Sequence, residues 1–175
     1  MDENIGRLLD SLKKQDLENE TLIIFFSDNG GLSTGSGPNS PTSSFPLKGG
    51  KSWLYEGGIR VPLIIKLPGK VKAGLKINEP VIGTDLYPTI LDLLELPLMP
   101  HQHKDGESLK ALVNGSKEKT DRDAVYFHYP HYHPINSMGP SGAIRTGKYK
   151  LIEVFETGNV ELYNLEKDLG ETVDL

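Results

Sequence analysis

The stretch that decides the fold is TLIIFFSDNGG, residues 21–31, in which an apolar run stops abruptly at a polar, glycine-rich turn. Residues 22–26 are apolar at every position, so both faces of the expected strand are hydrophobic. That pattern is typical of an interior strand of an α/β sheet. Open α/β sheets bind ligands at the carboxyl ends of their strands, which is where Asp28 and Asn29 stand. The stretch therefore predicts an α/β sheet, whose end is either a plain turn or a binding site.

The residues before this strand favour a helix. Ile5, Leu8, Leu9 and Leu12 recur at helical spacing, with polar residues between them. A strand that is apolar on both faces needs neighbours on both sides, and the rest of the chain supplies few candidates. We therefore expect a piece of a larger α/β protein, cut at its N-terminal side.

Downstream of the turn, a loop rich in Ser, Gly, Pro and Thr leads to a second strand and two helices. The loop covers about residues 30–50. Loops of this length are uncommon in compact domains unless they are functional. The segments that follow are, in order, a strand over 60–67, a helix beginning at Thr84 or Asp85, and a short helix over 108–113.

The hydrophobic period changes near residue 123. From there, β-rich runs alternate with hairpin turn signals at 146–147 and 157–159. We predict an α/β fold, with part of a mixed α/β sheet and its helices over residues 1–122 and a small antiparallel β subdomain over 123–175.

Composition excludes several kinds of site and partner. The chain has 175 residues, a formal net charge of −5 and no cysteine. Without cysteine there are no disulfides, zinc–thiolate sites or thiol nucleophiles. A weakly acidic chain with scattered Lys and Arg has no footprint for nucleic acid, and no apolar stretch is as long as a membrane span. The sequence itself indicates no compartment.

The polar turn offers two candidate metal ligands. The side-chain oxygens of Asp28 and Asn29 suit Ca²⁺ or Mg²⁺, but a calcium site needs about six to eight oxygens. The remaining ligands would have to come from elsewhere. Asp-Asn and Asn-Gly are also strong turn formers, so a turn without metal stays an alternative.

The segment PLKGGKSWLYEGGIRVP, residues 46–62, is a candidate anion site. Lys48 and Lys51 flank two glycines, which let backbone N–H groups approach a sulfate or phosphate ester while a lysine supplies charge. The segment is not a phosphate-binding P-loop, because Phe45 stands where that motif requires glycine. A solvated turn with two surface lysines is the alternative.

Other reactive side chains give weaker signals. GLSTG, residues 31–35, has the spacing of a nucleophile elbow around Ser33, but no helix can follow it. His131 and His133 lie in a Pro-bounded loop that could bind a metal or a sugar, or be an ordinary aromatic patch. Glu56 and Arg60, four residues apart, indicate a structural ion pair.

Taken together, these segments resemble the sulfatase (arylsulfatase-like) family of the alkaline-phosphatase superfamily, in its C-terminal portion. The resemblance rests on the order and spacing of four segments and runs over nearly the whole chain. They are NIGRLLDSLKKQDLENETLIIFFSDNGG (4–31), PLKGGKSWLYEGGIRVPLIIKLPG (46–69), GTDLYPTILDLL (83–94) and AIRTGKYKLIEVFETGNVELYNLEKDLGET (143–172).

The resemblance implies roles for particular residues. It makes Asp28 and Asn29 ligands of the active-site divalent cation, usually calcium. It makes Lys51 the lysine that contacts the sulfate ester and the leaving-group oxygen. Lys48 falls where the family tolerates various residues, so it is an open candidate for substrate binding. His131 and His133 fall in the subdomain whose loops line the family's substrate pocket, and they are candidates for sugar or aryl contacts.

The chain departs from the family in its nucleophile. Sulfatases use a Cys or Ser that is oxidised to formylglycine, in a Cys/Ser-x-Pro-x-Arg segment near the N-terminus, and this sequence has no such segment. The resemblance therefore implies part of a sulfatase, inactive alone. Its partners would be the missing N-terminal part and a sulfated glycan or aryl sulfate. The family implies export to the periplasm, the cell exterior or the lysosome. The alternatives are a phosphodiesterase or phosphonate hydrolase of the same superfamily, and a non-catalytic carbohydrate- or anion-binding module.

Overall fold

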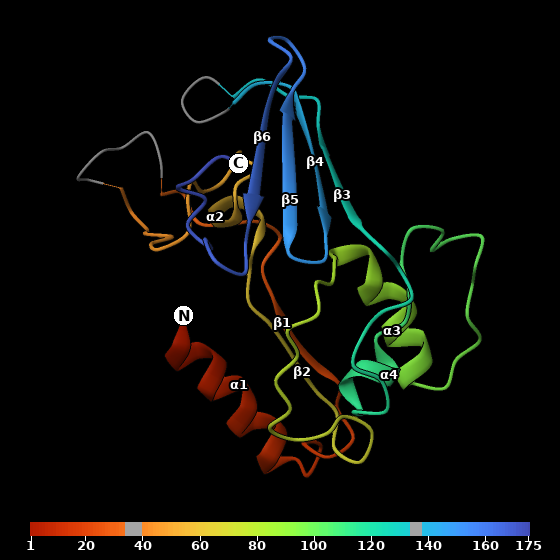
Figure 1. Cartoon of the computed structure of the whole chain (residues 1–175). Helices are drawn as coiled ribbons and strands as arrows, with labels where there is room; N and C mark the ends of the chain where they lie inside the picture. The colour runs from red at the N-terminus through yellow and green to blue at the C-terminus, as the bar shows by residue number, and fades with distance from the viewer. Residues whose placement is uncertain (34–39, 134–137) are drawn as a thin grey trace. The chain divides into compact units, whose positions relative to one another are not determined.

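The computed structural model in Figure 1 describes residues 1–33, 40–133 and 138–175. It contains helices and strands close to the predicted positions, and the second strand is shorter than expected. In chain order the elements are α1 (Asp2–Lys14), β1 (Ile23–Phe26), α2 (Glu56–Ile59), β2 (Leu63–Lys66), the 3-10 helix η2 (Gly83–Asp85), α3 (Leu86–Leu93), α4 (Lys110–Val113), β3 (Val125–Tyr129), β4 (Ser141–Thr146), β5 (Tyr149–Val154) and β6 (Asn159–Asn164).

The chain folds into two compact units, each made from two separate stretches. The first unit contains residues 1–25 and 63–120, and the second contains 26–62 and 121–175. Residues 26–62 group with the antiparallel sheet, and within them Leu54 and Tyr55 are buried in that sheet's core. The division at residue 122 into a main domain and a β subdomain stays a prediction.

The first unit is built around a small hydrophobic core under α3 and α4. Strands β1 and β2 form a two-stranded sheet. The Asp85 carboxylate is fully buried, and it accepts backbone N–H groups from Ile82 at 2.9 Å and Glu107 at 3.1 Å. These two hydrogen bonds tie the segment before α3 to the segment before α4. The buried core residues are Leu67, Leu93, Leu109, Leu112 and Val113.

Helix α1 forms where the apolar spacing predicted it, but none of its residues is buried. Leu8 is 61% exposed, and Phe25 and Phe26 at the end of β1 are 37% and 38% exposed. Among the described residues β1 pairs with β2 alone, so the second neighbour expected for an interior strand is not among them.

The second unit contains a four-stranded antiparallel sheet in the order β3-β4-β5-β6, drawn from cyan to blue in Figure 1. Gly147 and Gly158 take positive φ values of 50° and 68° in the β4–β5 and β5–β6 turns, which is why turn residues were readable there. The predicted meander, and the α/β class with a C-terminal antiparallel sheet, are confirmed.

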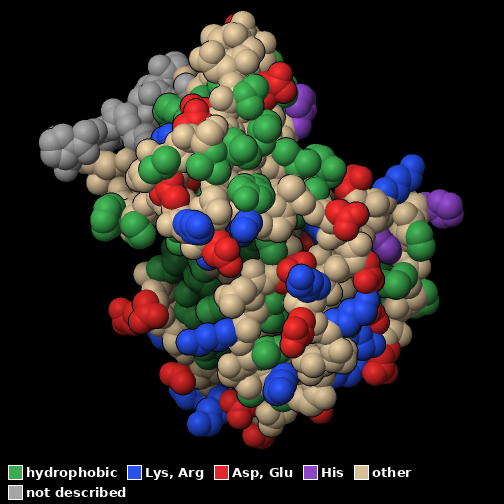
Figure 2. Space-filling model, in the orientation of Figure 1, with side chains coloured by type: hydrophobic (Ala, Val, Ile, Leu, Met, Phe, Trp, Pro, Cys, Tyr) green, Lys and Arg blue, Asp and Glu red, His purple; other side chains and the backbone are tan. Residues whose placement is uncertain are grey.

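The face shown in Figure 2 has mixed charge. Its Lys and Arg side chains are interspersed with Asp and Glu. Through the described parts of the chain, no helix combines the length and the apolar character that a bilayer crossing requires.

A buried ion cluster joins α2 to the sheet of the second unit. The Lys150 ammonium, on β5, has no exposed surface and lies 3.1 Å from Glu56 Oε1 and 2.6 Å from Glu171 Oε1. Glu171 also accepts the backbone N–H of Glu56 at 2.7 Å. Burial raises the pKa of Glu171 above its ordinary value, and the Lys150 ammonium opposes that rise. Arg60 and Arg145 complete the cluster, each 3.3–3.4 Å from Glu56 Oε2.

Replacement of Lys150 by Ala should destabilise the chain strongly. It leaves two buried carboxylates without their shared counter-ion, and breaking a buried pair in this way costs about 3–5 kcal/mol. The matched control is Lys148→Ala, in the exposed β4–β5 turn, which should change the unfolding free energy by no more than about 0.5 kcal/mol. Urea unfolding of both variants measures the difference.

The deficit of Lys150→Ala should also depend on pH. The Lys150 ammonium opposes the rise that burial causes in the pKa of Glu171, so its loss raises that pKa further in the folded state. The folded form is then favoured below the unfolded pKa of about 4.3 and penalised above it. We expect the full deficit at pH 7 and a smaller one near pH 4. Equal unfolding midpoints for Lys150→Ala and Lys148→Ala at pH 7 would contradict the importance of the cluster.

Candidate functional site

The polar turn after β1 presents the two candidate metal ligands. Asp28 is exposed, and Asn29 is half-buried. The Ser27 hydroxyl donates to the Asn29 carbonyl at 2.9 Å, and the Asn29 side-chain nitrogen donates to the Gly30 carbonyl at 3.1 Å. Because the amide nitrogen is used inside the turn, the Asn29 side-chain oxygen is the atom available to a ligand.

The donor chemistry of this turn fits a divalent cation. A carboxylate and an amide oxygen are hard ligands of the kind that Ca²⁺ prefers, but two residues supply too few of them. Among the described residues there is no group of three or more His, Asp and Glu that could hold a metal ion. A complete site would therefore need ligands from outside these ranges.

Backbone hydrogen bonds join the polar turn, residues 27–31, to the segment that contains Lys48 and Lys51. We call residues 48–58, which follow the long loop, the lysine loop. The Gly30 N–H donates to the Gly58 carbonyl at 2.8 Å, and the Lys51 N–H donates to the Gly31 carbonyl at 2.9 Å. The main chain of Lys51 is thus fixed to a residue three positions after Asp28, and the Lys51 side chain is exposed. The two motifs, separated by the long loop in sequence, meet in the structure. That the Lys51 ammonium and the Asp28 carboxylate face one cleft remains a prediction.

Glycines allow this close approach of three backbone segments. A Cβ on Gly57 would lie 2.5 Å from the Lys48 carbonyl oxygen. A Cβ on Gly30 would overlap the Gly57 carbonyl, and one on Gly58 would overlap the Trp53 carbonyl. Gly57 and Gly58 in α2 are therefore required because neighbouring backbone segments pack directly against them, and not because the turn needs a positive φ.

The second candidate lysine, Lys48, points toward β6. Its ammonium donates to the Tyr163 hydroxyl at 3.0 Å, lies 3.8 Å from Glu161 Oε2, and sits 3.9 Å from the centroid of the Tyr55 ring. Glu161 in turn accepts the hydroxyl protons of Tyr55 at 2.8 Å and Tyr163 at 2.6 Å. We call Lys48, Tyr55, Glu161 and Tyr163 the Lys48 cluster.

The two tyrosines of the Lys48 cluster act as hydrogen-bond donors. Burial is the main cause that raises the pKa of Tyr55 and of Tyr163, and the Glu161 carboxylate raises both further. Both phenols therefore stay protonated at neutral pH. They help to satisfy the Glu161 carboxylate together with the Lys48 ammonium.

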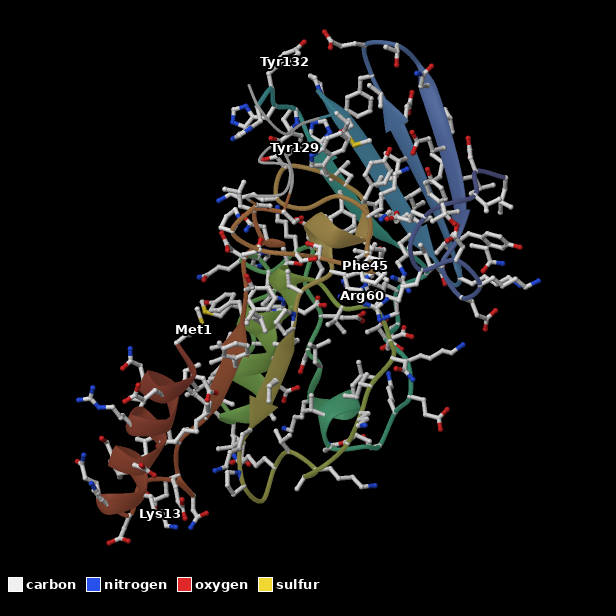
Figure 3. The ribbon with its side chains drawn as sticks, turned by 90° about the vertical axis from the view of Figure 1, so that its left-hand side faces the viewer. Met1, Lys13, Phe45, Arg60, Tyr129 and Tyr132 are labelled. Carbon is white, nitrogen blue, oxygen red and sulfur yellow. The ribbon has the colours of Figure 1, made fainter. Side chains whose placement is uncertain are left out.

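The histidine loop lies at the end of β3. Figure 3 labels Tyr129 and Tyr132, which flank His131 in the chain. His131 is exposed, with its ring 6.0 Å from that of Tyr129, and the Tyr132 hydroxyl donates to Glu156. His133 is exposed too and makes contacts of its own. The role of His131 and His133 as substrate contacts stays a prediction.

Two other sequence interpretations have structural outcomes. The ion pair between Glu56 and Arg60 is confirmed, with 3.4 Å between Oε2 and the guanidinium, although Lys150 is closer to the same carboxylate. Ser33 ties two loops together, because its hydroxyl donates to the Gly49 carbonyl at 2.8 Å. This is consistent with the rejection of the nucleophile elbow.

Sequence reasoning missed Glu161 and Tyr163. Both lie on β6 opposite core-facing residues of β5, since Tyr163 pairs with Lys150 and Glu161 pairs with Ile152. The alternation of side chains along β6 would place the Glu161 carboxylate on the core side. That signal can be used only when the facing strand and its register are known, and the sequence gives neither.

Two family models match the chain and overlap in its middle. The model described as sulfatase matches residues 1–96. The model described as N-sulphoglucosamine sulphohydrolase, C-terminal, matches residues 49–175. Each covers more than half of the chain.

Curated relatives match at similar identity. A sulfatase of Formosa agariphila is 34% identical over 192 aligned residues, which cover 100% of this chain and 34% of the relative. The human steryl-sulfatase is 37% identical over 147 residues, covering 78% of this chain and 25% of the relative. The chain thus spans about a third or less of the length of these relatives.

Solved structures share the fold. The structure of BT4656 in complex with its substrate D-glucosamine-2-N,6-O-disulfate superimposes with a TM-score of 0.79 at 30% identity, covering 99% of this chain and 33% of that one. With both family models and full-length relatives in agreement, the chain belongs to the sulfatase family and corresponds to the C-terminal portion of the full enzyme.

Proposed function

We propose that this chain is the C-terminal segment of a sulfate-ester hydrolase and carries part of the active site. It would contribute two ligands of the divalent-cation site and the lysine that binds the sulfate. The N-terminal part of the enzyme would contribute the formylglycine nucleophile and the remaining metal ligands. The observation that carries the proposal is the hydrogen bond from the Lys51 N–H to the Gly31 carbonyl, which brings the lysine loop to the polar turn.

In this proposal each residue has a chemical role. Asp28 and Asn29 would hold a divalent cation, Ca²⁺ in the first instance, through side-chain oxygens. When bound, such a cation screens the sulfate charge and polarises the S–O bond. The Lys51 ammonium stabilises the negative charge that develops on the leaving oxygen. His131 and His133 contact the organic part of the substrate.

The substrate class is a sulfated glycan or an aryl sulfate. The similar protein BT4656 is described with a sulfated glucosamine as its substrate, and it matches almost the whole of this chain. This likeness supports a sulfated sugar, and the exposed histidine and tyrosine side chains at the end of β3 could stack on and hydrogen-bond to one.

In the complete enzyme, Lys51→Ala should lower turnover of an aryl sulfate by roughly a hundredfold or more, as loss of an electrostatic stabiliser does. The unfolding midpoint should stay unchanged, because an exposed lysine side chain contributes little to stability. The matched control is the exposed Lys148→Ala, which should leave turnover unchanged. Steady-state kinetics on purified variants measures both. An enzyme indifferent to Lys51→Ala would overturn the proposed role of this lysine.

The isolated 175-residue chain should not hydrolyse aryl sulfates at any calcium concentration. It lacks the Cys/Ser-x-Pro-x-Arg segment that supplies the nucleophile in the family, and without that nucleophile the covalent route is lost. The measurement is release of the phenol from 4-nitrophenyl sulfate by the purified chain. Turnover that disappears in the Lys51→Ala chain, and so does not come from a contaminating sulfatase, would show that this segment carries a complete site.

A further inference from the structure

The Lys48 side chain is 38% exposed, but its ammonium is paired with side chains of the second unit. Its ammonium contacts a hydroxyl, a carboxylate and an aromatic face, all within 4 Å. These partners come from β6 and from Tyr55, the residue before α2. These contacts give the Lys48 ammonium a counter-ion within the protein, whereas the side chain of Lys51 is exposed.

We infer that Lys48 is a positioning residue for Lys51, acting through Glu161 and the loop between the two lysines instead of touching the substrate. The inference rests on the role proposed above for Lys51. Under this inference Lys48 does not bind the substrate directly, which was the role that the sequence suggested for it.

The loop between the lysines has no other side-chain anchor of its own. Residues 49 and 50 are glycines, and Gly49 has a positive φ of 74°. Gly50 is buried, and a Cβ there would overlap the Ser33 hydroxyl. Side chains at these two positions are therefore absent by necessity. The loop is held from outside by the Ser33 hydroxyl on the Gly49 carbonyl, and its own first anchoring side chain on the N-terminal side of Lys51 is that of Lys48.

The backbone of the loop transmits the anchoring over a short distance. The Lys48 carbonyl accepts the Gly57 N–H at 2.8 Å, and the Lys51 N–H donates to Gly31 at 2.9 Å. The two lysines are three positions apart in the chain, a span of at most about 10 Å. A shift of the Lys48 backbone, once its ammonium is released, moves Lys51 with it. Misplacement of about 1 Å can cost up to about a hundredfold in rate.

A double-mutant cycle in the complete enzyme tests this inference. The variants are Lys48→Met, which keeps the length of the side chain and removes the charge, Lys51→Ala, and the two combined. The readout is kcat/KM for a series of aryl sulfates of different leaving-group pKa. If Lys48 acts through Lys51, the single changes lower kcat/KM by about tenfold and about a hundredfold, and the double variant falls by about a hundredfold instead of a thousandfold.

The dependence of kcat/KM on leaving-group pKa distinguishes a role of Lys48 in positioning Lys51 from a role in protein stability alone. Lys51 stabilises the leaving oxygen, so its loss or misplacement makes kcat/KM more sensitive to leaving-group pKa. We expect a steeper dependence in Lys51→Ala and an intermediate one in Lys48→Met. Lys48→Arg, which can still pair with Glu161 and stack on Tyr55, should restore most of the rate.

Glu161→Gln provides a second route to the same result, in case Lys48→Met fails to fold. It should show the same loss, and the same lack of additivity with Lys51→Ala. Lys148→Ala serves as the unchanged control, and urea unfolding reports stability for every variant.

Three results would overturn the inference. Multiplicative losses in the double variant would show that Lys48 acts independently, for example on the substrate itself. An unchanged leaving-group dependence in Lys48→Met and in Glu161→Gln would reduce the cluster to a structural role. A Lys51→Ala enzyme with unaltered kinetics would overturn both this inference and the proposed role of Lys51, whereas the first two results leave that role intact.

Discussion

The buried ammonium of Lys150 is the interaction on which the second unit depends. Removing a charge from water costs several kcal/mol, and the cost is repaid only when partners of opposite charge surround it with good geometry. Here the partners are Glu56 and Glu171, 94 residues before and 21 residues after Lys150 in the chain. The cluster therefore requires that α2, β5 and the C-terminal segment meet at one point, and few other arrangements of these segments would satisfy all three charges.

The buried ion cluster around Lys150 also fixes the backbone of the candidate site. Glu171 holds the N–H of Glu56, at the first residue of α2. The next two residues of α2 are the glycines that contact the lysine loop and the polar turn, by bonds from Gly57 to Lys48 and from Gly30 to Gly58. A buried charge cluster thus fixes the short helix, and the short helix fixes the two loops. Asp28 and Lys51, two of the side chains proposed for chemistry, are exposed on this framework.

Local features of the fold could be predicted from the sequence, and long-range ones could not. The apolar run at 22–26, the helical spacing in α1 and the glycine turns of the meander depend on neighbours within a few residues, and they appear where expected. The Glu56–Arg60 pair is equally local. Lys150 has no such signal, because a lysine in an alternating strand is ordinarily read as facing solvent. Its burial depends on a carboxylate 94 residues away.

The same limit explains why two lysines three residues apart looked equivalent in the sequence. Residue type and glycine neighbours made both candidates for an anion, and neither composition nor spacing shows that β6 passes beside Lys48 with a carboxylate on its inner face.

The pairing has an electrostatic consequence for the loop. Two like charges repel each other, and a loop with two unpaired ammonium groups would attract anions at either of them. With Glu161 3.8 Å from Lys48, one positive charge of the loop is paired within the protein. The other, on exposed Lys51, is the one proposed to bind the sulfate. A single positioned charge suits a reaction in which negative charge develops on one leaving oxygen, because stabilisation aimed at that atom favours the transition state over the bound substrate.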